Sequence, residues 1–515
     1  MHIAVQIEKN TFRDSVYLMR LSSLIRSING IEGAEVIMGT DHNKNFLKQD
    51  DLLTPGIIEG AGANDMIIVV KAKDKKAAKE AIEEALNELN KEVGATINSE
   101  DGTAFTIDAA IKKLPGANLA LISIPGQYVE REALKLLEAG LNIFIFSDNV
   151  SIETEIMLKK IGIEKNLLVM GPDCGTAIIN GIPIAFANEI NRGHVGIVAA
   201  AGTGLQEVSC LIHNMGEGIS QGIGTGGRDV KETVGGITML AALATLIDDH
   251  QTKVIVVVSK PPSLIVAEKV IGLASKSNKP VVLNFIGANP SSCEAENCIF
   301  AETLKDAAEK AVLLLKNGRV DGVGTSVVRV NELVEIHKKS LQKGQKYLRG
   351  LFSGGTLAYE AMLILHKYLD GIYSNISLDP NYKLDNSFSS KAHTIIDLGE
   401  DEFTQGRPHP MIEPSLRNRF IIEESKDPET AVIMLDIVLG YGSHPDPAGQ
   451  ALKAIREASK EANLAGRNIV FVAYVCGTDK DPQNRTRQIQ ALESEGVLTF
   501  PSNADAATFV GELLK

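Results

Sequence analysis

Two short stretches of this sequence repeat the same small-residue turn in front of a helix-forming segment. Residues 195–212 read VGIVAAAGTGLQEVSCLI, and residues 347–364 read YLRGLFSGGTLAYEAMLI. Such a turn leaves the first backbone N–H groups of the helix without partners and directs the positive end of the helix at the same point. It therefore predicts a cradle for an anion such as phosphate, in which glycine lets the backbone come close to the ligand.

The two copies align without a gap. Thr203 and Thr356 are 153 residues apart, and so are Glu207 and Glu360, which indicates a duplicated unit. The predicted anion-binding residues of the two turns are Gly202, Thr203, Gly204, Gly354, Gly355 and Thr356. A structural interpretation stays open, because any turn from strand to helix favours glycine and an N-capping threonine. Pseudo-twofold packing of the two units would aim both helix starts at one site.

Basic side chains beyond other predicted strands are the candidates for catalysis. An arginine can grip a carboxylate or phosphate through two hydrogen bonds, and a histidine can polarise a carbonyl or move a proton near neutral pH. The predicted catalytic residues are Arg228 in GIGTGGRD, Arg407 and His409 in QGRPHP, and His444 in GSHPDP, and Gly226 and Gly227 join the predicted anion site. The alternative for each basic residue is a solvated loop position or a helix cap.

The elements that must position these residues alternate between apolar strands and helices from about residue 117 onward. Near-continuous apolar runs such as NLALISIP, LNIFIFSD and VIVVVSKPP predict parallel strands buried on both faces. Ligands of such doubly wound sheets gather beyond the carboxyl ends of the strands. We therefore expect an α/β protein with several flavodoxin-like or Rossmann-like domains. The first hundred residues follow the order β-α-β-β-α, which predicts a small ferredoxin-like α+β domain with a regulatory or interaction role.

Composition restricts the function classes. The chain has 515 residues and a formal net charge of -13, which argues against a nucleic-acid partner. Its five cysteines form no CxxC pair, so we expect reduced thiols and no metal site. No apolar run approaches the roughly 20 residues that span a bilayer, and charges near the start argue against a signal peptide. We expect a cytoplasmic protein that does not bind membranes.

Several longer stretches resemble known families. The block from about 119 to 290, with GPDCGTAI and VGIVAAAGTGLQE, resembles the alpha subunit of succinyl-CoA synthetase, and the later block resembles the ligase domain of its beta subunit. Nearly the full chain is similar to the FdrA family, most specifically through four stretches, YLRGLFSGGTLAYEA, DEFTQGRPHPMI, LGYGSHPDPAG and VCGTDKDPQN. In the synthetases, one helix from each ligase-type domain directs its N-terminus at a phosphate.

The resemblance also implies a domain organisation. The predicted domains are a ferredoxin-like domain (1–98), a CoA-binding-like Rossmann domain (99–190), a first succinyl-CoA-ligase-like domain (191–325), a connecting helix (326–346) and a second succinyl-CoA-ligase-like domain (347–515).

Departures from the synthetases shape the expected activity. The synthetases phosphorylate a histidine in a Gly-His-Ala-Gly loop, but the corresponding FIGANPSS (285–292) contains no histidine. There is no Walker A motif, and neither 1–100 nor 291–346 has the size of an ATP-grasp domain. We therefore expect no ATP site and no cofactor, with CoA binding left open.

The FdrA resemblance implies a component of a catabolic oxamate carbamoyltransferase in the breakdown of purines through allantoin. The reaction interconverts oxalurate plus phosphate with oxamate plus carbamoyl phosphate. Expected partners are carbamoyl phosphate or phosphate, a small carboxylate, and companion subunits in an oligomer. Two alternatives remain, namely a CoA-binding protein related to acyl-CoA ligases and a non-catalytic scaffold or regulatory subunit.

Overall fold

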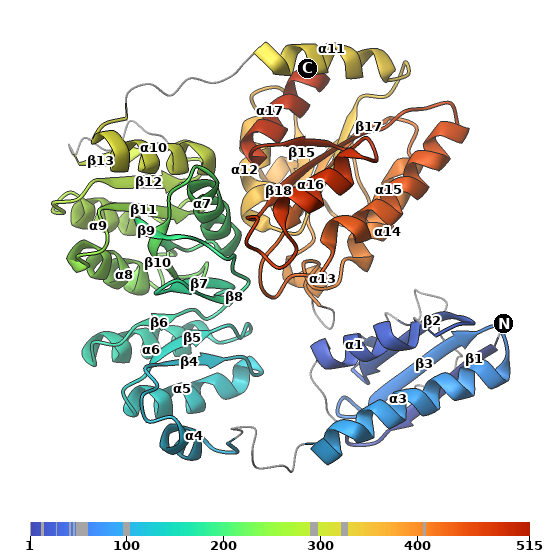
Figure 1. Cartoon of the computed structure of the whole chain (residues 1–515), viewed down its shortest axis with the longest axis horizontal. Helices are drawn as coiled ribbons and strands as arrows, with labels where there is room; N and C mark the ends of the chain where they lie inside the picture. Colours follow the sequence, from blue (N-terminus) through green and yellow to red (C-terminus); the bar gives the residue numbers. More distant parts are fainter. Residues whose placement is uncertain are drawn as a thin grey trace. The chain divides into compact units, whose positions relative to one another are not determined.

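The computed structural model describes residues 2–11, 15–26, 28–40, 43–44, 47, 60–95, 104–288, 297–320, 328–377, 379–404 and 408–515. They form two compact units, one comprising 1–113 with 400–409 and the other comprising 114–399 with 410–515. Figure 1 shows the elements of both units in chain order.

The N-terminal unit contains a three-stranded antiparallel sheet. Its elements are β1 (His2–Glu8), α1 (Ser15–Arg26), β2 (Ile31–Met38), β3 (Met66–Ala72), α3 (Lys75–Ala95), α4 (Ile107–Lys113) and, from later in the chain, α13 (Asp401–Thr404). The strand order is β1-β3-β2, and the central strand β3 is buried along nearly its whole length because both neighbours pair with it. The first five elements follow the predicted order β-α-β-β-α.

The larger unit begins with a small parallel sheet of order β4-β5-β6. Its elements are β4 (Leu119–Ile122), a 3-10 turn (Gly126–Tyr128), α5 (Val129–Glu138), β5 (Asn142–Ile145), α6 (Ile152–Glu164) and β6 (Val169–Met170). The chain then turns at Gly171 and Asp173, both of which have positive φ. The following strands β7 (Thr176–Ile179) and β8 (Ile182–Ala185) leave this sheet and pair antiparallel in the next one.

The seven-stranded sheet that follows has the order β13-β12-β11-β9-β10-β7-β8. Its parallel strands are β9 (Arg192–Ala199), β10 (Ile219–Gly224), β11 (Val254–Ser259), β12 (Val281–Phe285) and β13 (Cys298–Phe300). Helices α7 (Gly202–Asn214) and α10 (Leu304–Asn317) pack together on one face, and α8 (Ile237–Asp248) and α9 (Leu264–Ala274) pack together on the other (Figure 1).

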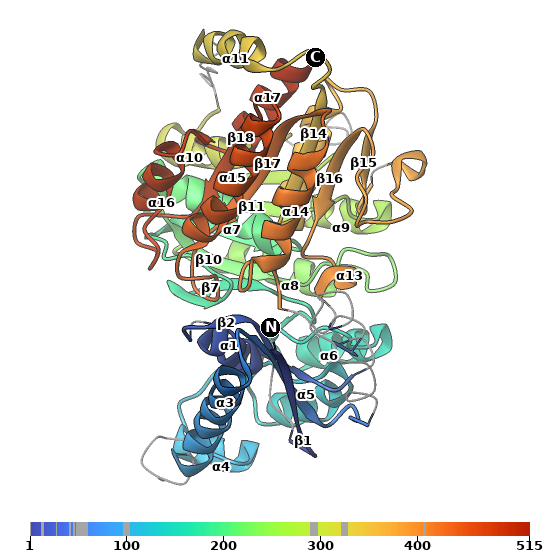
Figure 2. The same cartoon turned by 90° about the vertical axis from the view of Figure 1, so that its right-hand side faces the viewer.

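A six-stranded, wholly parallel sheet forms the C-terminal half, with the order β15-β16-β14-β17-β18-β19. The strands are β14 (Tyr347–Phe352), β15 (Ile372–Ser374), β16 (His393–Asp397), β17 (Thr430–Val438), β18 (Val470–Cys476) and β19 (Leu498–Phe500). The helices are α11 (Val328–Ser340), α12 (Gly355–Leu365), α14 (Ser415–Lys426), α15 (Pro447–Leu464), α16 (Arg485–Glu493) and α17 (Asn503–Leu514). Helices α14 and α15 lie side by side, as Figure 2 shows.

The two large sheets repeat one topology. The order β13-β12-β11-β9-β10 in the first matches β19-β18-β17-β14-β16 in the second, and α7 follows β9 as α12 follows β14. Helix α7 packs on α10, α12 packs on α17, and α7 contacts α12. One cluster of buried apolar side chains extends through both halves. The predicted α/β class with a small antiparallel N-terminal domain is confirmed.

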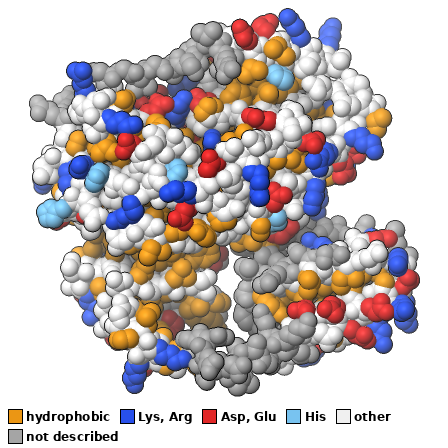
Figure 3. All heavy atoms as spheres, in the orientation of Figure 1, with side chains coloured by type: hydrophobic (Ala, Val, Ile, Leu, Met, Phe, Trp, Pro, Cys, Tyr) orange, Lys and Arg blue, Asp and Glu red, His pale blue; other side chains and the backbone are white. Residues whose placement is uncertain are grey.

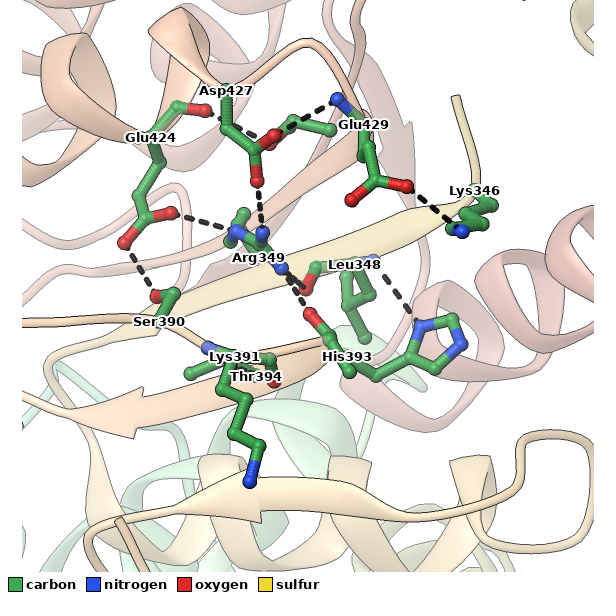
Figure 4. Close-up of polar contacts among 12 residues, drawn as sticks. Lys346, Leu348, Arg349, Ser390, Lys391, His393, Thr394, Glu424, Asp427 and Glu429 are labelled. Carbon is green, nitrogen blue, oxygen red and sulfur yellow. Dashed lines mark hydrogen bonds and ion pairs between the residues drawn. The ribbon is translucent and has the colours of Figure 1, made fainter. Parts of the chain in front are cut away.

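A buried charge cluster fixes the amino end of β14 (Figure 4). The Arg349 side chain is 2% exposed, and its guanidinium pairs with Glu424 at 2.6 Å and with Asp427. Its Nη1 donates to the Ala392 carbonyl oxygen before β16. A buried arginine needs such partners because an unpaired charge in the interior is costly. This cluster therefore ties α14 and β16 to the amino end of β14. The Gly-Thr turn follows the opposite, carboxyl end of the strand.

Surface and thiol features agree with the composition. On the face shown in Figure 3, basic and acidic side chains are interspersed without a large patch of one sign. Among the described residues, no helix combines the length and apolar character needed to cross a membrane. Cys174, Cys210, Cys298 and Cys476 are free and buried, and Cys293 lies outside the described residues.

Candidate anion-binding site

The start of α7 has no capping side chain. Strand β9 ends at Ala199, and the N-cap residue Ala201 carries only a methyl group. Within the described part of the chain, no acceptor lies within hydrogen-bond reach of the N–H groups of Gly202, Thr203 and Gly204. Because these are the donors that a helix start leaves over, the first predicted cradle presents three free N–H groups.

The start of α12 differs, because a carboxylate of the protein itself already accepts hydrogen bonds from two backbone N–H groups there. The Asp436 carboxylate on β17 accepts hydrogen bonds from the N–H of Ser353 at 2.8 Å and from the N–H of Gly354 at 2.7 Å. Asp436 is fully buried, and Arg417 of α14 pairs with it at 3.2 Å. Of the second predicted cradle, Gly355 alone keeps an N–H without an acceptor among the described residues.

The two helix starts meet. The N–H of Thr356 donates to Oγ1 of Thr203 at 3.3 Å. A Cβ atom at Gly354 would lie 2.9 Å from Cγ2 of Thr203, and one at Gly204 would lie 3.1 Å from Cγ2 of Thr356. A side chain at Gly354 would clash with Thr203, and one at Gly204 would crowd Thr356, so glycine lets the two turns pack closely. The tertiary structure thus brings together the turns that the repeat predicts to share a site.

One cation and one carboxylate border Gly355. A Cβ atom at this position would overlap Oδ2 of Asp397, at the end of β16, and would lie 3.6 Å from Nζ of Lys260, just beyond β11. The Lys260 ammonium group lies 5.8 Å above the ring of Tyr359. It forms no ion pair with any described residue. It is therefore the charged group best placed to compensate a bound anion at the junction of α7 and α12.

The loop after β10 joins domains. Arg228 pairs through Nε with buried Glu155 of α6 at 3.0 Å, and its Nη1 donates to the Val150 carbonyl oxygen at 2.9 Å. A Cβ at Gly226 would overlap the Pro172 carbonyl oxygen, whereas Gly227 lies near the Ala200 carbonyl oxygen, close to the start of α7. Next to Arg228, Asp229 accepts a bond from buried Lys159 at 2.7 Å. These contacts give Arg228 a domain-packing role.

The predicted histidines lie in different surroundings. Nδ1 of His444 accepts a bond from the N–H of Asp446 at 2.9 Å, which fixes the turn before α15. Burial lowers the pKa of His444, so its ring is neutral at pH 7. His409 is half-buried and belongs to the stretch 400–409 that groups with the N-terminal unit. Arg407 lies outside the described residues. The catalytic roles of all three stay predictions.

The repeated glutamates lie one helical turn behind the Gly-Thr turns. Glu207 is fully buried and Glu360 is 1% exposed. Burial raises the pKa of Glu360 to about 7. Burial and, second, the neighbouring Glu360 raise the pKa of Glu207 to about 8. Two buried carboxyl groups close together favour the state in which one of them keeps its proton.

Three residues of this region were missed at the sequence level, namely Lys260, Asp397 and Asp436. Two of them left a visible signal. Asp436 interrupts the otherwise apolar strand VIMLDIVLG, and Lys260 ends VIVVVSK, so each places a charge at the carboxyl end or in the interior of a buried strand. Asp397 ends TIID in the same way, but only the packing against Gly355 distinguishes it from other strand-end polar residues.

Comparisons with known families cover most of the chain. Residues 1–104 match the AllF heavy metal-associated domain, residues 190–287 match the CoA binding domain, and residues 351–513 match the CoA-ligase domain. These matches confirm the expected similarity of the chain to succinyl-CoA synthetase. The expected bounds of the CoA-binding-like domain, 99–190, stay predictions.

Curated relatives agree with these matches. The chain is 43% identical over 520 residues to "Uncharacterized protein YahF" of Escherichia coli (strain K12), covering 100% of this chain and 99% of the relative. It is 24% identical over 188 residues to the succinate–CoA ligase (ADP-forming) alpha subunit of Aquifex aeolicus (strain VF5), covering 35% of this chain and 60% of that subunit.

Two solved structures show a weaker likeness. A dinucleotide-forming acetyl-coenzyme A synthetase 1 of Ca. Korarchaeum cryptofilum is 16% identical, with a TM-score of 0.34, covering 80% of this chain and 87% of the other. The ATP citrate lyase of Methanothrix soehngenii is 13% identical, with a TM-score of 0.35, covering 79% and 78%. At TM-scores this low, neither likeness bears on function.

Proposed function

The chain belongs to the family of the Escherichia coli (strain K12) protein YahF, and from this premise we propose that it is a component of a carbamoyltransferase that binds phosphate where α7 and α12 meet. The observation that carries the proposal is the hydrogen bond from Thr356 to Thr203, which joins the two turns. It brings three free N–H groups of α7 beside the free N–H of Gly355.

The chemistry of this place suits an oxyanion. Backbone N–H groups at a helix start, together with the helix dipole, bind phosphate without a metal or a nucleotide. Lys260 adds a full positive charge 3.6 Å from the position that a Gly355 side chain would take. Preorganised donors of this kind also stabilise negative charge that develops on a carbonyl oxygen during acyl transfer.

The proposed reaction converts oxalurate and phosphate into oxamate and carbamoyl phosphate. A phosphate oxygen attacks the carbamoyl carbon, a C–O bond forms, the C–N bond breaks, and the departing nitrogen takes up a proton. The resemblance to the FdrA family and the match of residues 1–104 to the AllF domain support this substrate. His444, whose ring is neutral at pH 7, is proposed to polarise the carbamoyl carbonyl. His409 keeps its proposed catalytic role, and companion subunits are proposed to complete the enzyme.

The domain that residues 1–104 match is described as heavy metal-associated, but the residues of the N-terminal unit do not fit a metal site. Soft metals are held in proteins mainly by thiolates, and residues 1–104 contain no cysteine. The described residues also contain no group of three His, Cys, Asp or Glu side chains placed to hold a metal ion. No step of the proposed reaction uses a metal.

CoA binding is the second candidate function, because residues 190–287 match the CoA binding domain. The segment before β4 does not fit a dinucleotide-type cradle. Residues 104–118 form α4 and a short turn that contains one glycine, Gly116, instead of a glycine-rich loop after a strand. No step of the proposed reaction runs through CoA.

Calorimetric titration of the full-length chain tests the proposed site. Phosphate and carbamoyl phosphate should bind, and Lys260→Gln should weaken both about ten- to a hundredfold because it removes a charge-assisted bond. Lys253→Gln, at the opposite end of the same strand β11, is the matched control and should leave binding unchanged. Oxalurate and phosphate, supplied with companion subunits, should then yield carbamoyl phosphate.

Two other outcomes change the conclusion. Binding of CoA without a response to phosphate or carbamoyl phosphate would favour the second candidate. Equal phosphate affinity of Lys260→Gln and the parent chain would remove Lys260 from the site, and absence of phosphate binding in the parent chain would overturn the proposed function.

A further inference from the structure

Each of the two buried glutamates, Glu207 and Glu360, faces a helix of the other half. Glu360 of α12 accepts a hydrogen bond at Oε1 from the N–H of Leu304, the first residue of α10 in the other half, at 2.7 Å. The backbone N–H of Asn503, the first residue of α17, faces Glu207 of α7 in the same exchanged manner. Each glutamate thus faces the start of a helix from the opposite half.

The carboxyl groups of Glu207 and Glu360 differ in the hydrogen-bond donors that they receive. Glu360 also accepts a bond at Oε2 from the Asn503 side-chain amide at 2.8 Å, so both of its oxygens have donors. Neither oxygen of Glu207 completes a hydrogen bond of normal geometry with any described residue, although the Tyr474 hydroxyl and the Cys476 thiol face it. An ionised carboxylate needs donors in the interior far more than a protonated one does. The contacts therefore place the charge on Glu360 and the proton on Glu207.

The surroundings supply no cation to compensate a second charge. The titratable and polar groups that face Glu207 from the packed elements are Glu360 (α12), Tyr474 and Cys476 (β18), and the N–H of Asn503 (α17). Asp505 of α17 faces Glu360 and pairs with Lys305 of α10 at 2.7 Å, while Asp481 and Arg485 face the neighbouring Cys210 of α7. Among these described groups, no free positive charge is directed at Glu207.

We propose that Glu207 carries a proton at neutral pH and that anion binding at the junction of α7 and α12 strengthens its hold on that proton. Glu207 follows Thr203 by four residues, so it lies about 6 Å along the helix axis behind the free N–H groups. At this separation in a protein interior, a bound anion opposes ionisation of the carboxyl group. By reciprocity, ionisation of Glu207 opposes anion binding. The coupling rests on the proposed anion site, whereas the protonation of Glu207 does not.

Infrared spectroscopy of the full-length chain tests the protonation directly. At about pH 7 the difference spectrum between the parent chain and Glu207→Gln should contain the carbonyl band of a protonated carboxyl group, and this band should disappear as the pH rises to about 9. Glu302→Gln, which removes an exposed glutamate of the same half, is the matched control and should not remove the band. A difference spectrum without the band would overturn the protonation of Glu207.

Sulfate is the probe for the coupling, because this tetrahedral dianion does not itself titrate near neutral pH. The dissociation constant for sulfate should rise between about pH 6 and about pH 9. This rise should be about three- to tenfold larger in the parent chain than in Glu207→Gln. Calorimetry in two buffers of different ionisation enthalpy should show proton uptake on binding by the parent chain and none by Glu207→Gln.

The outcomes separate the two proposals. Sulfate and phosphate binding with no proton uptake would overturn the coupling and leave the anion site in place. Absence of binding of either anion would overturn the proposed function and the coupling together, while the carboxyl band would still decide the protonation state of Glu207.

Discussion

The N–H of Thr356 lies 3.3 Å from Oγ1 of Thr203, its own counterpart in the duplicated unit. A residue that touches its copy lies close to the axis that relates the copies, as in an isologous dimer interface. The same relationship accounts for the buried pair of Glu207 and Glu360. The duplication therefore has a physical consequence, because it places at one point two helix starts whose N-cap residues form no side-chain cap.

Thr203→Val should test the contact between the halves. Valine keeps the shape of threonine but cannot accept the bond from Thr356, so the free energy of unfolding should fall by about 1 kcal/mol and phosphate binding should weaken. Urea unfolding and calorimetry measure the two effects. Thr245→Val is the control, because the Thr245 hydroxyl bonds only its own helix and should change phosphate binding little.

Asp436→Asn should be strongly destabilising. Asparagine keeps the volume but loses the charge opposite Arg417, which is 2% exposed, and leaves a buried guanidinium without compensation. The expected loss in the free energy of unfolding is about 3 to 5 kcal/mol. Glu495→Gln breaks an exposed pair with Arg456 and should change the free energy of unfolding little. Similar losses for the two variants in chemical denaturation would contradict the anchoring role of Asp436.

Gly355→Ala should destabilise the chain, because a Cβ atom at this position overlaps Asp397. The expected cost is about 1 to 3 kcal/mol. Gly272→Ala, in the last turn of α9 with open space around it, should instead stabilise by about 0.5 to 1 kcal/mol. Thermal unfolding of the two variants gives opposite shifts if this packing is right.

Glu207→Gln should change how stability depends on pH. The pKa of Glu207 is about 8 in the folded chain against an ordinary value of 4.5. Between these values the folded chain holds a proton that the unfolded chain has released, so this contribution to the free energy of unfolding falls as pH rises and is fully lost above about pH 8. The parent chain should lose about 2 to 4 kcal/mol more than Glu207→Gln between about pH 5 and about pH 8.5. Parallel curves in urea unfolding would contradict the raised pKa.

Much of the fold was visible in the sequence. Continuous apolar runs such as VIVVVS and VIMLDIV predict buried parallel strands, and both are strands of the two large sheets. The gap-free repeat predicts two equivalent strand–turn–helix units, because local sequence sets local structure. The turn at Gly171 was not recognised as the end of one sheet, since the antiparallel pairing of β7 with β10 depends on residues more than 40 positions away.

The sequence by itself determined which backbone segments expose N–H groups, because small residues, glycine and the absence of a capping side chain act within a few positions. Only the tertiary structure decided which of these groups stay free. Asp436, about 80 residues from Gly354, fills part of the second turn, and Glu155, more than 70 residues before Arg228, pairs with the side chain of this predicted catalytic residue. Such pairings depend on sheet order and on the packing of one half against the other, which no local pattern encodes. The same packing gave Glu207 and Glu360 their burial and their mutual repulsion.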